Sequence, residues 1–237
     1  MTGSPPLLLV AHGSRSDAAD AVIRSLADAV AERGPQVEVC YVDVRGPKVV
    51  DAVAALRDRG HGGAVVVPAF LASGYHVRTD LPEQLHESGA DVEMFRATPA
   101  MGPDPLLARA AHARLVDAGW RPGDAVVLAA AGSSDPDAMV EVHRAAEMLT
   151  PLVGRRVRVG FAATGTPGVT SLVESLHAAG EERVAVASWL LAPGVFQNRL
   201  LASGADVVAE PLGVHDHVVD TLVERYRTGL AALPHAA

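Results

Sequence analysis

Residues 9–14 read Leu-Val-Ala-His-Gly-Ser, and residues 128–133 read Leu-Ala-Ala-Ala-Gly-Ser, so one motif recurs 119 positions later. Two further pairs of segments match at a spacing of 120 positions: residues 37–41 with 157–161, and residues 71–74 with 191–194. Each of these segments lies in a predicted strand or at its end. Agreement in register at three strand ends indicates an internal duplication.

Short β-branched runs alternate with amphipathic stretches throughout both halves. The predicted strands are residues 7–11, 37–42, 64–70, 92–95, 125–131, 157–162, 184–190 and 207–209. Helices are predicted between them and at residues 218–230. This alternation is typical of right-handed βαβ units around a parallel sheet. We therefore predict an α/β fold with two similar halves, residues 1–119 and 120–237, each a mainly parallel sheet flanked by helices.

The composition excludes several classes of protein. The 237 residues contain 20 Lys and Arg against 28 Asp and Glu, and this net charge of −8 argues against nucleic-acid binding. The single cysteine, Cys40, excludes an intrachain disulfide framework and a multi-thiolate zinc site. The apolar runs are shorter than a membrane span, and no secretory leader pattern precedes residue 7. We expect a cytoplasmic protein with no membrane or nucleic-acid partner.

The two halves differ in titratable residues at equivalent strand ends. In the first half stand His12, Asp43 and His76, and in the second Ala131, Ala163 and Phe196. Residues that the fold requires should recur in both halves, whereas residues of a single active site need not. The carboxyl ends of parallel strands are also where open α/β sheets bind ligands. Two imidazoles and a carboxylate at this edge predict either a metal site with open coordination positions or an acid–base site.

Residues beside these strand ends are suited to an anionic ligand. Ser14 and Arg15 follow the first strand, and Arg45 and Arg78 lie on the turns after the next two. Gly74 allows a close approach near His76. Each cation has the alternative interpretation of an ordinary solvated surface charge.

Other polar residues have simpler structural explanations. Asp80 and Glu83 have the spacing of a capping box, with Pro82 in the first turn of the helix, so we predict that both stabilise its start. His215 and His217 stand at a predicted helix start, where side chains at i and i+2 do not face one another. We therefore expect no ligand there.

Three segments together resemble the motifs of the class II chelatases of siroheme and cobalamin synthesis, and among these the long, two-half sirohydrochlorin chelatases. They are residues 11–15 (Ala-His-Gly-Ser-Arg), residues 41–47 (Tyr-Val-Asp-Val-Arg-Gly-Pro) and residues 70–77 (Phe-Leu-Ala-Ser-Gly-Tyr-His-Val). The resemblance implies chelatase-like halves that enclose a cleft. It also implies a lyase that inserts Fe²⁺ or Co²⁺, or Ni²⁺ in a related branch, into a sirohydrochlorin-type tetrapyrrole.

The resemblance also implies roles for individual residues. The metal-handling histidines of the family correspond to His12 and His76, which would present the metal and accept the pyrrole protons. Asp43 stands where the family commonly has Glu, so it keeps the charge but has a shorter reach. It would orient an imidazole or contribute charge. The predicted substrate-binding residues are Ser14, Arg15, Arg45, Gly74 and Arg78, with Ser133, Gln197 and Asn198 from the second half.

In the second half no histidine stands at the positions equivalent to His12 and His76, and the resemblance therefore predicts one active site per chain. No permanently bound cofactor is implied, because the metal is a substrate. A fused duplicate can supply both walls of the cleft as a monomer.

Two alternative functions remain open at this point. A tetrapyrrole or metal carrier would use the same cleft without turnover, and only an activity measurement separates it from an enzyme. Histidine phosphotransfer enzymes also place His-Gly after the first strand, but they carry Arg before the histidine. Ala11 occupies that position here, so the phosphate clamp is missing.

Overall fold

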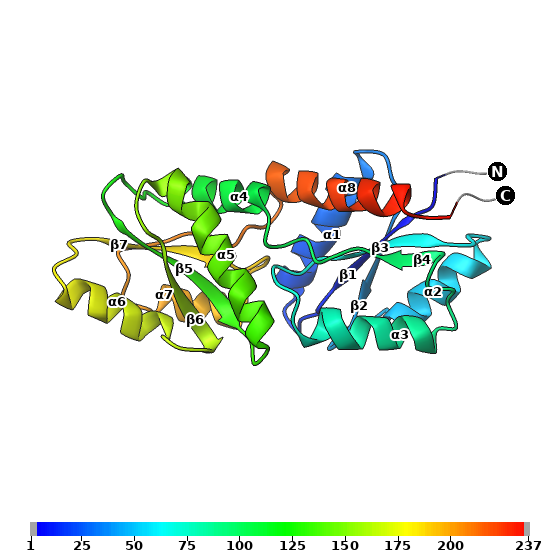
Figure 1. The fold of residues 1–237 in the computed structure, drawn as a ribbon, viewed down its shortest axis with the longest axis horizontal. Coiled ribbons are helices and arrows are strands. Elements are labelled where there is room, and N and C mark those ends of the chain that lie inside the picture. Colours follow the sequence, from blue (N-terminus) through cyan, green and yellow to red (C-terminus); the bar gives the residue numbers. More distant parts are fainter. Residues whose placement is uncertain (1–3, 235–237) are drawn as a thin grey trace. The chain divides into compact units, whose positions relative to one another are not determined.

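The structure, a computed structural model, describes residues 4–234 and contains two four-stranded sheets in which all paired strands are parallel (Figure 1). The first sheet has the order β2-β1-β3-β4, with bounds Val37–Tyr41, Leu7–Ala11, Ala64–Pro68 and Phe95–Ala97. The second has the order β6-β5-β7-β8, with bounds Arg158–Thr164, Ala125–Gly132, Val184–Trp189 and Val207–Val208. The predicted α/β fold with two similar parallel sheets is confirmed.

Helices cover both faces of the first sheet. They are α1 (Asp17–Ala31), α2 (Val49–Asp58), α3 (Leu81–Glu87) and α8 (Asp216–Ala231), with a π-type turn, η1 (His76–Asp80), directly before α3. Figure 1 shows α2 and α3 on one face and α1 and α8 on the other. Helix α1 is capped by Ser16, whose hydroxyl accepts a hydrogen bond from the N–H of Ala19, as N-cap residues commonly do.

The core of this sheet explains its uninterrupted apolar strands. Leu8 and Val10 of β1 pack in one cluster with Val53 and Leu56 of α2. All five residues of β1 are buried, because a central parallel strand has helices on both faces. The sequence of β1 therefore shows no polar alternation.

The second sheet is covered in the same way. Its helices are α4 (Pro105–Asp117), α5 (Pro136–Val153), α6 (Val169–Ala178) and α7 (Val195–Leu201). Leu172 and Val173 of α6 pack with Val127 and Val186 of the sheet, while α4 and α5 contact one another and the strands β7 and β5 respectively. The sequence repeat is thus a repeat of structure.

The two compact units of the fold do not coincide with the two halves of the sequence repeat. Helix α4 comes from the first half but belongs to the second unit, and most of α8 comes from the second half but belongs to the first unit. One unit comprises Met1–Met101 with Val219–Ala237, and the other comprises Gly102–Val218. Most of α8 therefore joins the first sheet, where Arg225 donates to the carbonyl oxygens of Ala100 and Met101 at 3.1 Å. The predicted boundary at residues 119–120 separates the two copies of the sequence repeat, and it stays a prediction.

One strand is displaced from its predicted position. Strand β4 begins at Phe95, whereas the sequence predicts a strand over residues 92–95. The carboxylate of Asp91 accepts from the N–H of Glu93, and its carbonyl accepts from Met94 and Phe95. This turn uses the backbone groups that a strand would need.

Among the described residues, no helix has both the length and the apolar character required to cross a bilayer.

Candidate active site

His12 directly follows β1, at the carboxyl edge of the first sheet. The next residue, Gly13, has φ +95°, and a Cβ there would lie 2.3 Å from the carbonyl oxygen of Asp43. Only glycine combines this backbone conformation with so close an approach. The loops after β1 and β2 are therefore in contact beside His12, and the N–H of Asp43 donates to the carbonyl of His12 at 3.0 Å.

His76 reaches the same edge from the segment after β3. It opens the π-type turn, in which the N–H of Leu81 donates to its carbonyl five residues back. This turn places Asp80 Oδ2 2.5 Å from His76 Nδ1. Gly74 supports the start of the turn, because its carbonyl accepts from the N–H groups of Val77 and Arg78.

The predicted capping role of Asp80 is wrong. Asp80 has helical φ and ψ and makes no side-chain hydrogen bond to the start of α3, since the π-type turn runs into α3 without a break. Its carboxylate instead holds an imidazole ring. His76 and Asp80 are four residues apart, a spacing at which side chains meet once the segment adopts a helical turn.

The two imidazoles meet at their Nε2 atoms, which lie 3.0 Å apart with the ring planes at 89°. His12 Nδ1 lies 2.9 Å from the carbonyl of Gly13, which can only accept, so Nδ1 carries the proton. His76 Nδ1 likewise donates to Asp80. Both Nε2 atoms therefore direct lone pairs at one another. Such an arrangement repels unless a proton or a metal cation is shared between the nitrogens.

The distance between these nitrogens suits a shared metal ion. Metal–imidazole bonds of about 2.0–2.1 Å bring two ligand nitrogens to about 3.0–3.4 Å from one another. Within residues 4–234, no group of three or more His, Cys, Asp or Glu side chains is arranged to hold a metal ion. The pair therefore offers two protein ligands and leaves the remaining coordination positions open, as a metal that must be passed on requires.

Asp43 lies near the two histidines, but among the described residues its carboxylate makes no hydrogen bond to either ring. The hydrogen bond from the N–H of Val44 lowers the pKa of the Asp43 carboxyl, and the nearby positive charge of Lys48 lowers it further. It is exposed and ionised at neutral pH. The Nδ1 atoms of the two rings contact the Asp80 carboxylate and the Gly13 carbonyl, and both roles predicted for Asp43 stay predictions.

Two aromatic rings flank the histidines, and neither belongs to the predicted site residues. The Phe70 ring centroid lies 6.5 Å from that of His12 and 6.4 Å from that of His76. Tyr75 lies 6.0 Å from His76 and is 59% exposed. Both stand in the motif of residues 70–77, and their rings lie beside those of the two histidines.

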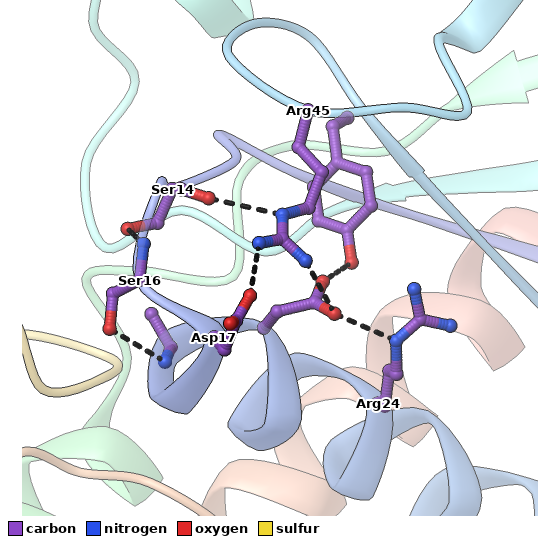
Figure 2. A network of polar contacts seen from close by, with 8 residues as sticks. Ser14, Ser16, Asp17, Arg24 and Arg45 are labelled. Carbon is purple, nitrogen blue, oxygen red and sulfur yellow. Dashed lines mark hydrogen bonds and ion pairs between the residues drawn. The ribbon is translucent and has the colours of Figure 1, made fainter.

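The predicted substrate-binding cations have different surroundings. Arg45 donates to the Ser14 carbonyl at 3.1 Å and pairs with Asp17 at 2.7 Å, as Figure 2 shows. Arg78 donates to the Ser73 carbonyl at 2.6 Å, and Arg15 is exposed. The Ser14 hydroxyl accepts from the N–H of Ser16. The guanidinium of Arg45 is thus already engaged within the protein.

In the second unit, Ser133 accepts from the N–H of Asp135, and Asn198 is exposed on α7. Gln197 is only 4% exposed and donates to the Ala209 carbonyl at 3.0 Å. Contact with a ligand would require Gln197 to leave this position. The substrate-binding roles of Ser133 and Asn198 stay predictions.

A scan of protein families finds that the CbiX model matches residues 6–118 and again residues 125–229. The chain belongs to the CbiX family. The two segments that match the CbiX model correspond to the two halves of the sequence repeat, and both site histidines lie in the first.

Named relatives agree with this membership of the CbiX family. A sirohydrochlorin cobaltochelatase of Sulfolobus acidocaldarius is 33% identical over 93 residues, covering 39% of this chain and 76% of the relative. A sirohydrochlorin ferrochelatase of Priestia megaterium is 25% identical over 95% of this chain and 91% of its own. The solved structure of SirB from Bacillus subtilis with Fe³⁺ has a TM-score of 0.85 at 23% identity, covering 97% of this chain and 96% of SirB. This last match concerns the fold.

Proposed function

We propose that this chain inserts a divalent metal, Fe²⁺ or Co²⁺, into sirohydrochlorin. The observation that carries the proposal is the convergence of the Nε2 atoms of His12 and His76, 3.0 Å apart, at the carboxyl edge of a parallel sheet. Membership of the CbiX family and the sirohydrochlorin chelatases among its relatives support the choice of substrate.

The two-ligand site fits the chemistry of insertion. A metal held by His12 and His76 alone keeps positions at which pyrrole nitrogens can replace water. Insertion of M²⁺ displaces two pyrrolic protons, and each imidazole can accept one as the metal leaves its Nε2. Asp80 then stabilises the positive charge on His76 through the hydrogen bond to Nδ1. Metal transfer and proton acceptance thereby use the same two atoms.

The carboxylates of the macrocycle require a local positive field in a chain of net charge −8. Arg15 and Arg78 are exposed near the histidines and suit this task, together with the N–H groups around Ser14. The aromatic surfaces of Phe70 and Tyr75 suit a flat ring. We further propose that the chain acts as a monomer in the cytoplasm without a resident cofactor, and that Ni²⁺ is a third candidate metal.

The test is to mix the purified chain with metal-free sirohydrochlorin and Fe²⁺ or Co²⁺ under anaerobic conditions and to follow the absorption change. We expect insertion to be faster than in the protein-free control. The absence of acceleration with each metal would contradict the proposal. Binding of both metal and tetrapyrrole without acceleration would instead support a carrier.

A further inference from the structure

A buried polar network lies beneath the loops that carry the site. Asp20 of α1 is 8% exposed, and its carboxylate accepts from the hydroxyl of Tyr41 at the end of β2, which is 1% exposed. Arg45, on the loop after β2, pairs with the same carboxylate at 3.0 Å. Burial and the hydrogen bond to Asp20 raise the pKa of Tyr41 to about 12.

Arg45 connects this network to both loops. Its Nε donates to the carbonyl of Ser14, two residues after His12, and another guanidinium nitrogen pairs with Asp17 (Figure 2). Its own N–H donates to the carbonyl of Asp43 at 2.5 Å across Val44, which has φ +55°. A β-branched residue rarely adopts this conformation, so the surrounding contacts must hold it.

The second unit shows that the fold does not need this network. The repeat places Met139, Phe161 and Gly165 where the first unit has Asp20, Tyr41 and Arg45. The structure confirms that these three are neighbours, because a Cβ on Gly165 would lie 2.7 Å from the Phe161 ring and 2.8 Å from Met139 Cε. An apolar cluster therefore fills the same place in the unit that lacks the histidines.

We infer that Asp20, Tyr41 and Arg45 are positioning residues that fix the loops after β1 and β2 and thereby the setting of His12 and Asp43. The expected effect on the insertion rate rests on the proposed function, whereas the positioning of the loops rests on the contacts alone. Arg45 acts from within the protein, through Ser14 and Asp43, and not as a ligand for a substrate carboxylate. Preorganisation of this kind affects the reacting geometry more than the binding of a remote part of the substrate.

The test replaces the network with the residues of the second unit, in the variant Asp20→Met/Tyr41→Phe/Arg45→Gly. The matched control is Arg24→His, which removes the other guanidinium on Asp20 and introduces the second-unit residue, since Arg24 is 59% exposed and contacts neither loop. We expect kcat for insertion to fall by about tenfold or more in the triple variant, with KM for sirohydrochlorin within about twofold. The control should retain the wild-type kcat.

A second readout needs no tetrapyrrole. Co²⁺ titration of each variant should show weaker binding in the triple variant and wild-type binding in Arg24→His. If the triple variant does not fold, the single variant Tyr41→Phe, which keeps the shape of the side chain, should also bind Co²⁺ more weakly than the wild type.

Several outcomes would overturn the inference. Wild-type kcat and wild-type Co²⁺ affinity in the triple variant would do so. A raised KM with unchanged kcat would assign Arg45 to substrate binding instead. An inactive wild type would contradict the proposed function, and the Co²⁺ titrations would still decide whether the network positions the histidines.

Discussion

The two units share a strand order, a set of covering helices and a pair of equivalent loops, yet they differ at almost every polar position of those loops. The first unit has the His12–His76 pair, whereas the second has Ala131 and a 41% exposed Phe196. Beneath the loops, the first has an ionic network and the second an apolar cluster. The scaffold therefore folds without the site, and the polar residues of the first unit require an explanation in terms of function.

The sharpest test of this comparison replaces each site histidine of the first unit with the residue that stands at the equivalent position of the second unit. We expect His76→Phe and His12→Ala each to lower the insertion rate at least about 100-fold, because each removes a metal ligand and a proton acceptor. The rate is measured by the anaerobic absorption assay.

The control for this pair is His86→Phe, an exposed histidine on α3 outside the site. It should keep the wild-type rate. If His76→Phe and His12→Ala both retain most of the activity, the enzyme does not use the nitrogen pair, and the difference between the units has another cause.

A smaller effect is expected from Asp80→Asn, which keeps the size of the side chain but removes the charge that holds His76 Nδ1. Removal of such a partner typically costs about 10- to 100-fold in metal affinity or activity. Co²⁺ titration and kcat measure it, with the exposed Glu83→Gln on the adjacent helix as the control. Equal Co²⁺ affinity in Asp80→Asn and the wild type would show that the carboxylate does not orient the ring.

The contrast between units also explains what the sequence could predict. The repeat, the parallel sheets and the location of His12 and His76 follow from periodicity and register, because both are local patterns that recur. The role of Asp80 could not be separated from helix capping, since it depends on a π-type turn that no residue pattern announces. Likewise, Arg45 resembles a surface cation in the sequence. Its partners Asp20 and Ser14 are 25 and 31 residues away and meet it only in three dimensions.

Equivalent glycines allow the effects on stability and on activity to be separated. Gly13 and Gly132 both have positive φ, and a Cβ on either would collide with a carbonyl, that of Asp43 or Thr164. Gly13→Ala and Gly132→Ala should each lower the free energy of unfolding by about 1–3 kcal/mol. Only Gly13→Ala should also lower kcat, by less than the loss of Asp80 does.

Denaturant unfolding and kcat per folded molecule measure the two effects. Similar losses of kcat in both variants would mean that the loops of the second unit matter to the reaction as much as those of the first. The functional asymmetry between the units would then be wrong, although the histidine assignment would stand.

The smallest effect is expected at Gln197, which the sequence placed in the substrate site. Its amide donates to the Ala209 carbonyl, and that carbonyl also accepts from Ser188, so Gln197→Leu leaves the carbonyl with a partner. Gln197 Oε1 has no partner among the described residues, and replacement by an apolar side chain of similar size removes that buried group. We expect a change in unfolding free energy within about 1 kcal/mol and an unchanged KM for sirohydrochlorin. A raised KM in Gln197→Leu, with Asn198→Ala as the exposed comparison, would show that α7 rearranges to bring this buried amide to the substrate.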